Sequence, residues 1–202
     1  MNIERLKDDI FDSRNPERQY KAAYSMRYVQ NDQEVVQILF SACYEAKDPR
    51  LQQEAVRSLG ILQPDRALNT FIKSTYNRDS GKRMRAYFHL GTLGDPKGVD
   101  EIIKGFSDSN VMARRAAVIS AGRIACDYTT IEDLKRLLNG FEPESIKKEV
   151  WNAIDNIQKR LSNKRSFNNN NNRSFKRRDF NKPVNNRNNN NRIRGDYTPK
   201  AF

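Results

Sequence analysis

The stretch that decides the fold is LGDPKGVDEIIKGFSDSNVMARRAAVISAGRI, residues 93–124, because its features recur in the residues before it. Three kinds of residue return at an interval of 31 residues. They are the glycines Gly60, Gly91 and Gly122, the alanines Ala55, Ala86 and Ala117, and the aliphatic residues Leu62, Leu93 and Ile124. Coincident columns with one period are typical of stacked structural repeats rather than of a single wound domain. The pattern predicts a repeat fold and indicates no enzymatic activity.

Helix signals divide each repeat into two parts. Asn15-Pro16 and Asp48-Pro49 each place a capping residue before a proline at the first helical turn. Pro64 and Gly94-Asp95-Pro96 interrupt the apolar periodicity where a second helix can begin. No segment alternates at period two over a useful length, so we expect no strands. The predicted fold class is an all-α solenoid of about four helix pairs, with capping helices over residues 1–12 and 142–161.

The residues that carry this pattern resemble a HEAT-like repeat, in the short variety first described in phycobilin lyases. They are Leu90–Pro96, Val99, Ile102, Ile103, Asp108, Ala113–Ala117 and Gly122–Ile124. The resemblance covers roughly residues 15–161 and is strongest in the three central repeats. It implies an α-solenoid in which the second helix of each pair lines a concave side. It implies little about function, because this family includes scaffolds, nucleic-acid readers and a few enzymes.

Positive charge is concentrated at the C-terminal end of the chain. The 202 residues carry a formal net charge of +12. Residues 163–202 hold 11 of the 37 basic residues and 2 of the 25 acidic ones, a net +9, which leaves +3 for residues 1–162. A nearly balanced body with a strongly basic end is typical of an interaction segment that binds a polyanion. We therefore predict a solenoid over residues 1–162 and a basic tail over residues 163–202.

Asparagine, basic and aromatic residues dominate this tail. Thirteen of its forty residues are Asn, and its apolar side chains are too few to build a core, so we expect disorder in the free protein. Cationic side chains contact phosphates and aromatic rings stack on unpaired bases, which predicts binding of RNA or single strands rather than duplex DNA. The alternatives are a solubilising segment and binding to acidic protein or membrane surfaces. The candidate nucleic-acid-binding residues are Arg165, Phe167, Arg173, Phe175, Lys176, Arg177, Arg178, Phe180, Arg187, Arg192, Arg194 and Tyr197.

A second basic feature keeps the period of the repeat. The candidate concave basic stripe consists of Lys73, Lys104 and Lys135, with Arg66 and Lys97 one face away. Neighbouring helices in a solenoid pack roughly 8–10 Å apart, so these cations would stand at regular steps along a phosphate backbone or an acidic partner. Glu101 and Glu132 occupy the neighbouring column. An ordinary solvated face is therefore the alternative interpretation.

Single residues bear on the enzymes that HEAT-like folds support. A di-iron hydroxylase of the deoxyhypusine type needs several His-Glu pairs, whereas the chain has one histidine, His89, which we place at the edge of a first-helix face. A DNA-alkylation glycosylase needs an acid and aromatic residues on a basic concave surface. We assign Trp151 to the packing stripe of the last helix and Asp155 to a surface ion pair. Nothing identifies a chromophore pocket, a nucleophile arrangement or a phosphate-binding glycine loop.

The cysteines and the N-terminus indicate a cellular compartment. Cys43 and Cys126 lie in apolar periodic segments and are interpreted as small core residues of a reducing compartment. The first residues are too charged for a signal peptide, and no apolar run approaches the ~20 residues of a membrane span. We expect a cytoplasmic or nucleoid-associated protein.

Together these features predict a non-enzymatic interaction scaffold without cofactor, metal or catalytic residues. The solenoid would offer a protein partner a rigid curved surface, and the tail would raise the local concentration near RNA or DNA. The alternative is an enzyme on a HEAT-like scaffold, either a DNA-alkylation glycosylase-like or a phycobilin-lyase-like protein.

Overall fold

The computed structural model describes residues 2–140 and 142–179, and every regular element in these ranges is a helix. The chain divides into two units, Met1–Asn163 and Lys164–Phe202. The α-helices are α1 Ile3–Phe11, α2 Pro16–Met26, α3 Gln33–Glu45, α4 Pro49–Leu62, α5 Pro64–Ser74, α6 Ser80–Leu93, α7 Val99–Lys104, α8 Val111–Ile124, α9 Tyr128–Leu138 and α10 Glu144–Asp179; short 3-10 turns, Pro96–Gly98 and Gly105–Ser107, flank α7. The predicted all-α class, with four helix pairs and helices at both ends, is confirmed.

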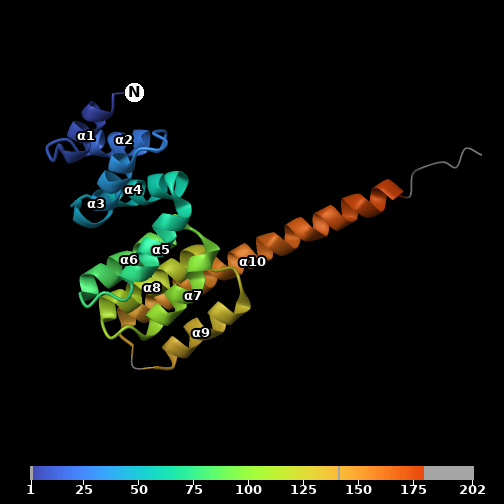
Figure 1. Cartoon of the computed structure of the whole chain (residues 1–202). Helices are drawn as coiled ribbons and strands as arrows, with labels where there is room; N and C mark the ends of the chain where they lie inside the picture. The colour runs from blue at the N-terminus through green and yellow to red at the C-terminus, as the bar shows by residue number, and fades with distance from the viewer. Residues whose placement is uncertain (1, 141, 180–202) are drawn as a thin grey trace, which may run out of the picture. The chain divides into compact units, whose positions relative to one another are not determined.

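The helix pairs of the unit Met1–Asn163 stack in chain order (Figure 1). The first helices α2, α4, α6 and α8 contact one another in succession. The second helices α3, α5 and α7 also contact the first helix of the following pair, namely α4, α6 and α8. Each repeat thus buries one side against its neighbour, which is the arrangement of a solenoid. The predicted caps Asn15 and Asp48 are in place, since their side-chain oxygens accept N–H bonds at the starts of α2 and α4. Asp79 and Asn110 cap α6 and α8 in the same way.

The glycine column lies where first helices of successive repeats touch. A Cβ atom built on Gly60 would stand 2.8 Å from Leu93, and one on Gly122 would stand 2.8 Å from the backbone of Ala153 in α10. One on Gly91 would stand 2.6 to 2.9 Å from Ser120. These distances are shorter than carbon atoms tolerate, so the absence of a side chain permits the close approach. The 31-residue period therefore marks the interface between repeats.

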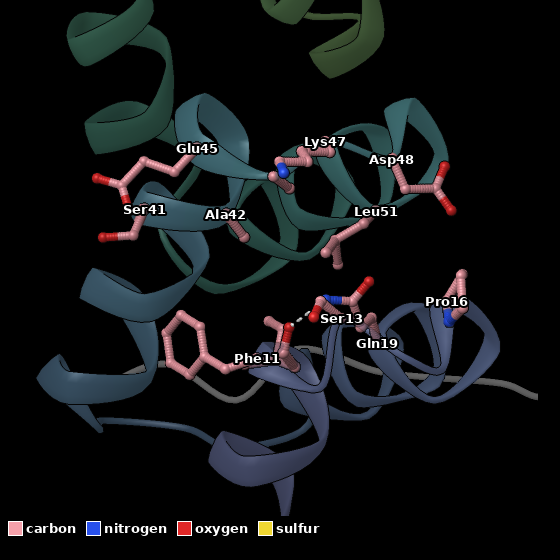
Figure 2. Close-up of a pocket in the computed structure, with 12 residues that line it drawn as sticks. Phe11, Ser13, Pro16, Gln19, Ser41, Ala42, Glu45, Lys47, Asp48 and Leu51 are labelled. Carbon is pink, nitrogen blue, oxygen red and sulfur yellow. Dashed lines mark hydrogen bonds between the residues drawn. The ribbon is translucent and has the colours of Figure 1, made fainter.

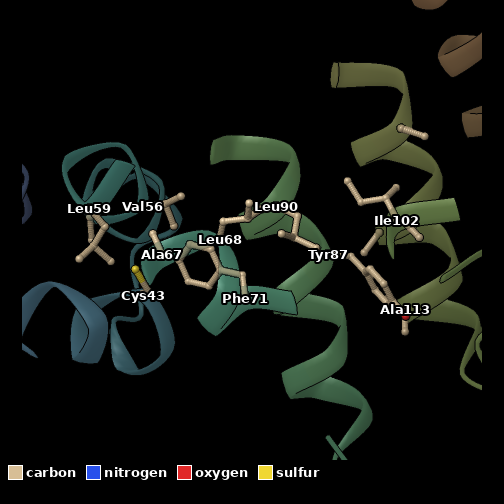
Figure 3. Packing of buried hydrophobic residues seen from close by; sticks show 14 of the residues in the cluster. Cys43, Val56, Leu59, Ala67, Leu68, Phe71, Tyr87, Leu90, Ile102 and Ala113 are labelled. Carbon is tan, nitrogen blue, oxygen red and sulfur yellow. The ribbon is translucent and has the colours of Figure 1, made fainter. Parts of the chain in front are cut away.

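A single apolar core continues through the repeats (Figure 3). The alanines of the second column, Ala55, Ala86 and Ala117, are fully buried. Larger residues such as Phe71 and Leu90 fill the space between the helix layers, with Cys43 buried beside them. The prediction that Cys43 is a core residue is confirmed.

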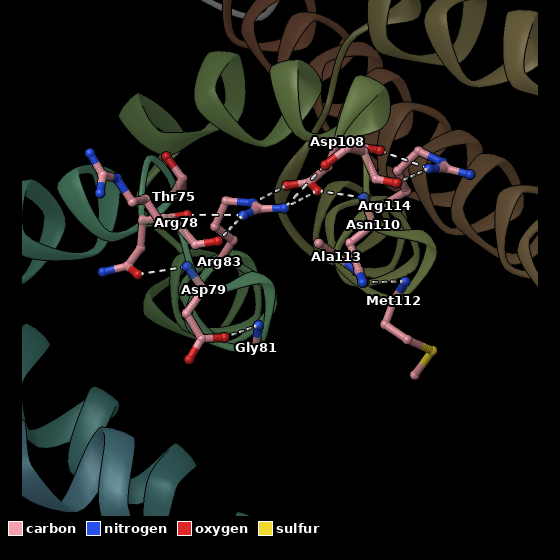
Figure 4. Close-up of polar contacts among 12 residues, drawn as sticks. Thr75, Arg78, Asp79, Gly81, Arg83, Asp108, Asn110, Met112, Ala113 and Arg114 are labelled. Carbon is pink, nitrogen blue, oxygen red and sulfur yellow. Dashed lines mark hydrogen bonds and ion pairs between the residues drawn. The ribbon is translucent and has the colours of Figure 1, made fainter.

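Two arginines make the same polar contact between successive repeats (Figure 4). Arg83 donates from Nε and Nη2 to the Asp108 carboxylate at 2.7 and 2.8 Å, and from Nη1 to two carbonyls of the preceding loop. Arg114, 31 residues later, pairs with Glu142 at 3.0 Å and also donates to two loop carbonyls. The hydrogen bonds from Arg83 lower the pKa of Asp108. Such bidentate pairs fix the angle between neighbouring repeats because their geometry is specific.

His89 occupies a third inter-repeat column. Ser58 and Ser120 stand one repeat before and after it, and each donates its hydroxyl to a carbonyl of the preceding repeat at 2.8 Å. His89 is 3% exposed, and its ring lies 5.0 Å from that of Phe71 and 5.3 Å from that of Tyr44. Burial lowers its pKa to about 4. The expectation that His89 lies at the edge of a helix face is wrong, because Ser58, His89 and Ser120 all point into the interior of the solenoid and are buried.

Two further expectations about core residues are wrong. Trp151 is 59% exposed, since the face of α10 that buries Val150 and Ile154 does not extend to Trp151. Cys126 is exposed because it falls in the loop between α8 and α9. Asp155 behaves as expected and pairs with Lys159 at 2.6 Å.

The last helix extends further than composition predicts. The sequence predicts disorder from residue 163, because Asn has a low helix propensity and apolar residues are sparse. The backbone instead stays helical to Asp179. Helix extension from an existing end adds one hydrogen bond per residue and avoids the cost of nucleation. The expected disorder of residues 180–202 lies outside the described residues.

Replacing Gly91 tests the tight contact between repeats. Gly91→Ala should lower the free energy of unfolding by about 1–2 kcal/mol, because overpacking against Ser120 outweighs the roughly 1 kcal/mol of helix propensity that alanine adds. Urea denaturation measures this difference. The control is Gly140→Ala, whose nearest neighbour is 3.5 Å away and which should change stability by less than about 0.5 kcal/mol. A stabilised Gly91→Ala protein would contradict the proposed close approach.

Burial of His89 predicts a specific pH dependence. Because its folded pKa of about 4 lies below its ordinary value of 6.5, protons bind the unfolded chain better between these values. Stability should therefore be complete above pH 6.5 and fall toward pH 4, by up to about 1.4 kcal/mol per pH unit. His89→Phe should remove this component in denaturant melts across that window. Identical pH profiles for the two proteins would show that His89 is not held neutral.

Candidate nucleic-acid interface

The structure places the three predicted lysines at equivalent positions. Lys73, Lys104 and Lys135 each lie in the last turn of a second helix, in α5, α7 and α9 respectively. All three side chains are exposed. Cations near a helix C-terminus interact favourably with its partial negative charge, so a stabilising role of this position accounts for part of the pattern.

The three lysines differ in their ion pairs. Lys104 donates to Glu101 at 3.1 Å, and this bond raises the pKa of Lys104. Lys135 pairs with Glu132, one turn earlier in α9, at 2.9 Å. Lys73 has no ion pair within the part of the chain that the structure describes. Among these described residues, the stripe therefore has one unpaired ammonium group rather than three.

Glu101 is a buried hydrogen-bond acceptor, although the sequence places it with Glu132 beside the lysine stripe, where an exposed side chain is expected. The residue is 7% exposed. Its carboxylate accepts hydrogen bonds from Thr75 Oγ1 at 2.7 Å and from the Tyr76 hydroxyl at 3.0 Å, in addition to Lys104. A buried carboxylate needs such donors because desolvation of an unpaired charge is costly. Glu101 joins the end of α5 to α7 and fixes the position of Tyr76.

Arg66 and Lys97, the two stripe residues one face away from the lysines, also have polar partners. Arg66 donates from Nη1 to Gln33 at 2.8 Å and to Gln63 at 3.1 Å, and its guanidinium lies 5.5 Å from the ring centroid of Phe40. Lys97 pairs with Asp65 at 3.7 Å, and both side chains are largely exposed. Exposed pairs of this kind are weak and leave both groups accessible to a ligand.

The tail candidates fall into two groups. The first lies on the helical backbone of α10, and the second lies outside the described residues. The first group is Arg165, Phe167, Arg173, Phe175, Lys176, Arg177 and Arg178; the second is Phe180, Arg187, Arg192, Arg194 and Tyr197.

Sequence reasoning missed the stretch from Lys73 to Arg85, which joins α5 to α6. It contains five basic residues and one acidic residue, Asp79. Tyr76, near its start, is 66% exposed. The charge run is visible in the sequence, but the 31-residue period singles out only Lys73. Local charge imbalance is the signal that would have identified the rest.

The N-terminal part of the solenoid contains a cleft (Figure 2). Its volume is about 390 Å³, and it lies between the α1–α2 segment and the α3–α4 pair. Phe11, which is 61% exposed, faces it together with Ala42 and Leu51. Glu45, Lys47 and Asp48 provide polar groups at its rim. The cleft is apolar in its centre and contains none of the predicted site residues.

The described residues offer neither a metal-binding cluster nor a membrane-crossing helix. In residues 2–140 and 142–164, no group of three or more His, Cys, Asp or Glu side chains could hold a metal ion. Within the described ranges, no helix combines the length and apolar composition that a membrane crossing requires.

Comparison with known proteins supports the repeat fold. Residues 3–85 match the HEAT repeats family. The sequence resemblance rests on residues from Leu90 to Ile124, which lie after the matched range. The assignment of these later repeats is therefore supported by their fold and not by the family match. No curated protein sequence matches the chain.

One solved structure shares the fold of this chain. The complex of CpcE and CpcF of phycocyanin lyase from Nostoc sp. PCC7120 is 17% identical, with a TM-score of 0.51 over 75% of this chain and 96% of that chain. An engineered protein is also 17% identical, with a TM-score of 0.44 over 79% of this chain and 98% of that chain. At this level of identity the likeness to the CpcE–CpcF complex concerns the fold alone. Residues 3–85 thus match the HEAT repeats family, and the chain has the fold of a HEAT-like solenoid.

Proposed function

We propose that this protein is a non-enzymatic scaffold whose C-terminal segment binds nucleic acid, RNA or single strands in preference to duplex DNA. The observation that carries the proposal is the charge asymmetry, net +9 in residues 163–202 against net +3 in residues 1–162. Basic residues alternate there with aromatic ones, the composition that serves phosphate contacts and base stacking. Many cations of the solenoid are already in ion pairs, such as Arg83–Asp108 and Arg115–Glu149. Uncompensated charge is thus concentrated in the tail.

The solenoid is proposed to bind a protein partner. HEAT-like repeats expose extended surfaces that a rigid stack of helices holds in place. The CpcE–CpcF complex is a structure in which proteins of this fold assemble with each other. Binding of a partner to the solenoid would bring it close to the nucleic acid on the tail, which raises the effective concentration. A cytoplasmic location is proposed because Cys43 and Cys126 are both free cysteines, as is usual in a reducing compartment.

Neutralising the tail tests the proposal. In the full-length chain, Arg165, Arg173, Arg177, Arg178, Arg187, Arg192 and Arg194 are replaced by Gln together with Lys176. Binding of a fluorescent oligo(U) of about 20 nucleotides is measured by anisotropy across a salt series. The wild type should bind with an affinity that falls steeply with salt. The variant should bind at least about tenfold more weakly, and its salt slope should drop by about 0.7 for each phosphate that the protein no longer neutralises.

The matched control changes the same segment without changing its charge. Asn168–Asn172 are replaced by Gln, which preserves the amide groups and the length. Affinity and salt slope should stay within about twofold of the wild type, since the phosphate contacts are retained. The proposal fails if neutralising the arginines leaves both quantities unchanged.

A further inference from the structure

Four cations at the junction of α5 and α6 have no carboxylate partner among residues 2–140 and 142–164. We name them the junction cluster: Lys73, Arg78, Lys82 and Arg85. The fifth basic residue of the stretch, Arg83, is paired with Asp108. The one acid, Asp79, accepts the Gly81 N–H at 2.7 Å as the cap of α6. The local positive charge is therefore uncompensated within those ranges.

The repeat itself does not require cations at two of these positions. The equivalent residues of Lys82 and Arg85 are Leu51 and Glu54 one repeat earlier, and Ala113 and Ala116 one repeat later, all of them buried. The Glu54 carboxylate is compensated by Arg27 and Arg57. Apolar side chains thus satisfy the packing at three of these four positions, and the fourth, Glu54, is an acid rather than a cation. The third repeat instead carries two positive charges at these positions, with Lys82 exposed and Arg85 half-buried.

Arg85 is the most costly member of the cluster. It is half-buried, and its Nε has no solvent access and no hydrogen-bond partner among the described residues. The Nε atoms of Arg27 and Arg115 share this feature, but their terminal nitrogens bind Glu54 and Glu149. A guanidinium removed from water without a partner reduces stability. The terminal nitrogens of Arg85 also have no hydrogen-bond partner among the described residues, and an anion bound at the junction would accept hydrogen bonds from them.

Tyr76 provides an exposed aromatic surface in the same stretch of chain, between Lys73 and Arg78. Its side chain is 66% exposed, while its hydroxyl donates to the buried Glu101 at 3.0 Å. Its backbone N–H donates to the Lys73 carbonyl, and Lys104 Nζ lies 3.5 Å from its hydroxyl. The ring is thus anchored through its hydroxyl at Glu101 and Lys104, and the backbone of Tyr76 is anchored at the end of α5. Figure 4 shows the nearby Arg78 side chain pointing away from the Arg83–Asp108 pair.

We infer that the junction cluster and Tyr76 form a second binding site for single-stranded nucleic acid, on the solenoid itself. The four cations contact consecutive phosphates, and the anchored ring stacks on one unpaired base. A single strand fits better than a duplex, because a duplex offers no unpaired base to the ring. It also fits better than an acidic peptide, whose carboxylates give the ring nothing to stack on. This inference rests on the proposed function and assigns part of the binding to described residues.

Removing the two cations that the packing does not require tests the site. Lys82→Ala with Arg85→Ala restores the residues of the following repeat, so the full-length protein should fold and melt at or above the wild-type temperature. Its affinity for the same oligo(U) should fall about tenfold, and its salt slope by about 1.4, the value for two phosphates. The control is Lys21→Ala with Arg136→Ala, which removes two charges already paired within α2 and α9. The control should bind within about twofold of the wild type.

A second pair of variants tests the ring. Tyr76→Leu should weaken oligo(U) binding about fivefold or more, since a base loses its stacking partner. Tyr76→Phe keeps the ring and should retain most of the affinity, although it removes the bond to Glu101. Neither change should alter binding to a duplex of the same length. Equal reductions for Leu and Phe would contradict stacking and indicate a structural role.

The outcomes separate this inference from the proposed function. If tail neutralisation weakens binding while the Lys82/Arg85 variant matches its control, the tail proposal stands and the junction site is overturned. If only the junction variant weakens binding, the tail proposal fails and the junction site stands. If the wild type does not bind oligo(U), both fail. If polyglutamate binds the wild type as tightly as oligo(U), the junction is a site for acidic protein and the inference is overturned.

Discussion

Close contact between successive first helices is the constraint on which the rest of the structure depends. Gly91 and Gly122 leave no room for a Cβ atom, because Ser120 and Ala153 of the next repeat occupy that space. Helices that approach so closely exclude water along their length and bury the alanine columns completely. The arginine pairs Arg83–Asp108 and Arg114–Glu142 then fix how each repeat meets the next. Side chains on every repeat inherit a regular spacing from this contact.

The regular spacing explains why the solenoid could be predicted and why its exceptions could not. Caps such as Asn15 and Asp48 act locally, so sequence alone reveals where helices begin. The position of His89 depends on the rotation of α6 against Tyr44 and Phe71, which no local signal specifies. Trp151 is exposed because the buried face of α10, which includes Val150 and Ile154, ends before it reaches Trp151. A stripe of apolar residues in the sequence does not reveal how wide the buried face is.

The candidate interface shows the same division between local and tertiary information. The period places Lys73, Lys104 and Lys135 at one position of three second helices, as predicted. Their pairing depends on neighbours: Glu101 accepts bonds from Thr75 and Tyr76, and it also binds Lys104. Likewise, Arg85 is unpaired among the described residues because no carboxylate lies within reach, which becomes visible only once helices are packed. The uneven charge of the tail, in contrast, follows from composition alone.

The central claim is that nucleic acid contacts both the basic tail and the junction between α5 and α6. Photo-crosslinking of the full-length protein to an oligonucleotide of 4-thiouridine, followed by mass spectrometry of the crosslinked peptides, measures these contacts directly. We predict crosslinks in the peptide that contains Tyr76 and in peptides of residues 163–202, both abolished when unlabelled oligo(U) competes. Crosslinks confined to other surfaces of the solenoid, or none above a bovine albumin control, would contradict the claim.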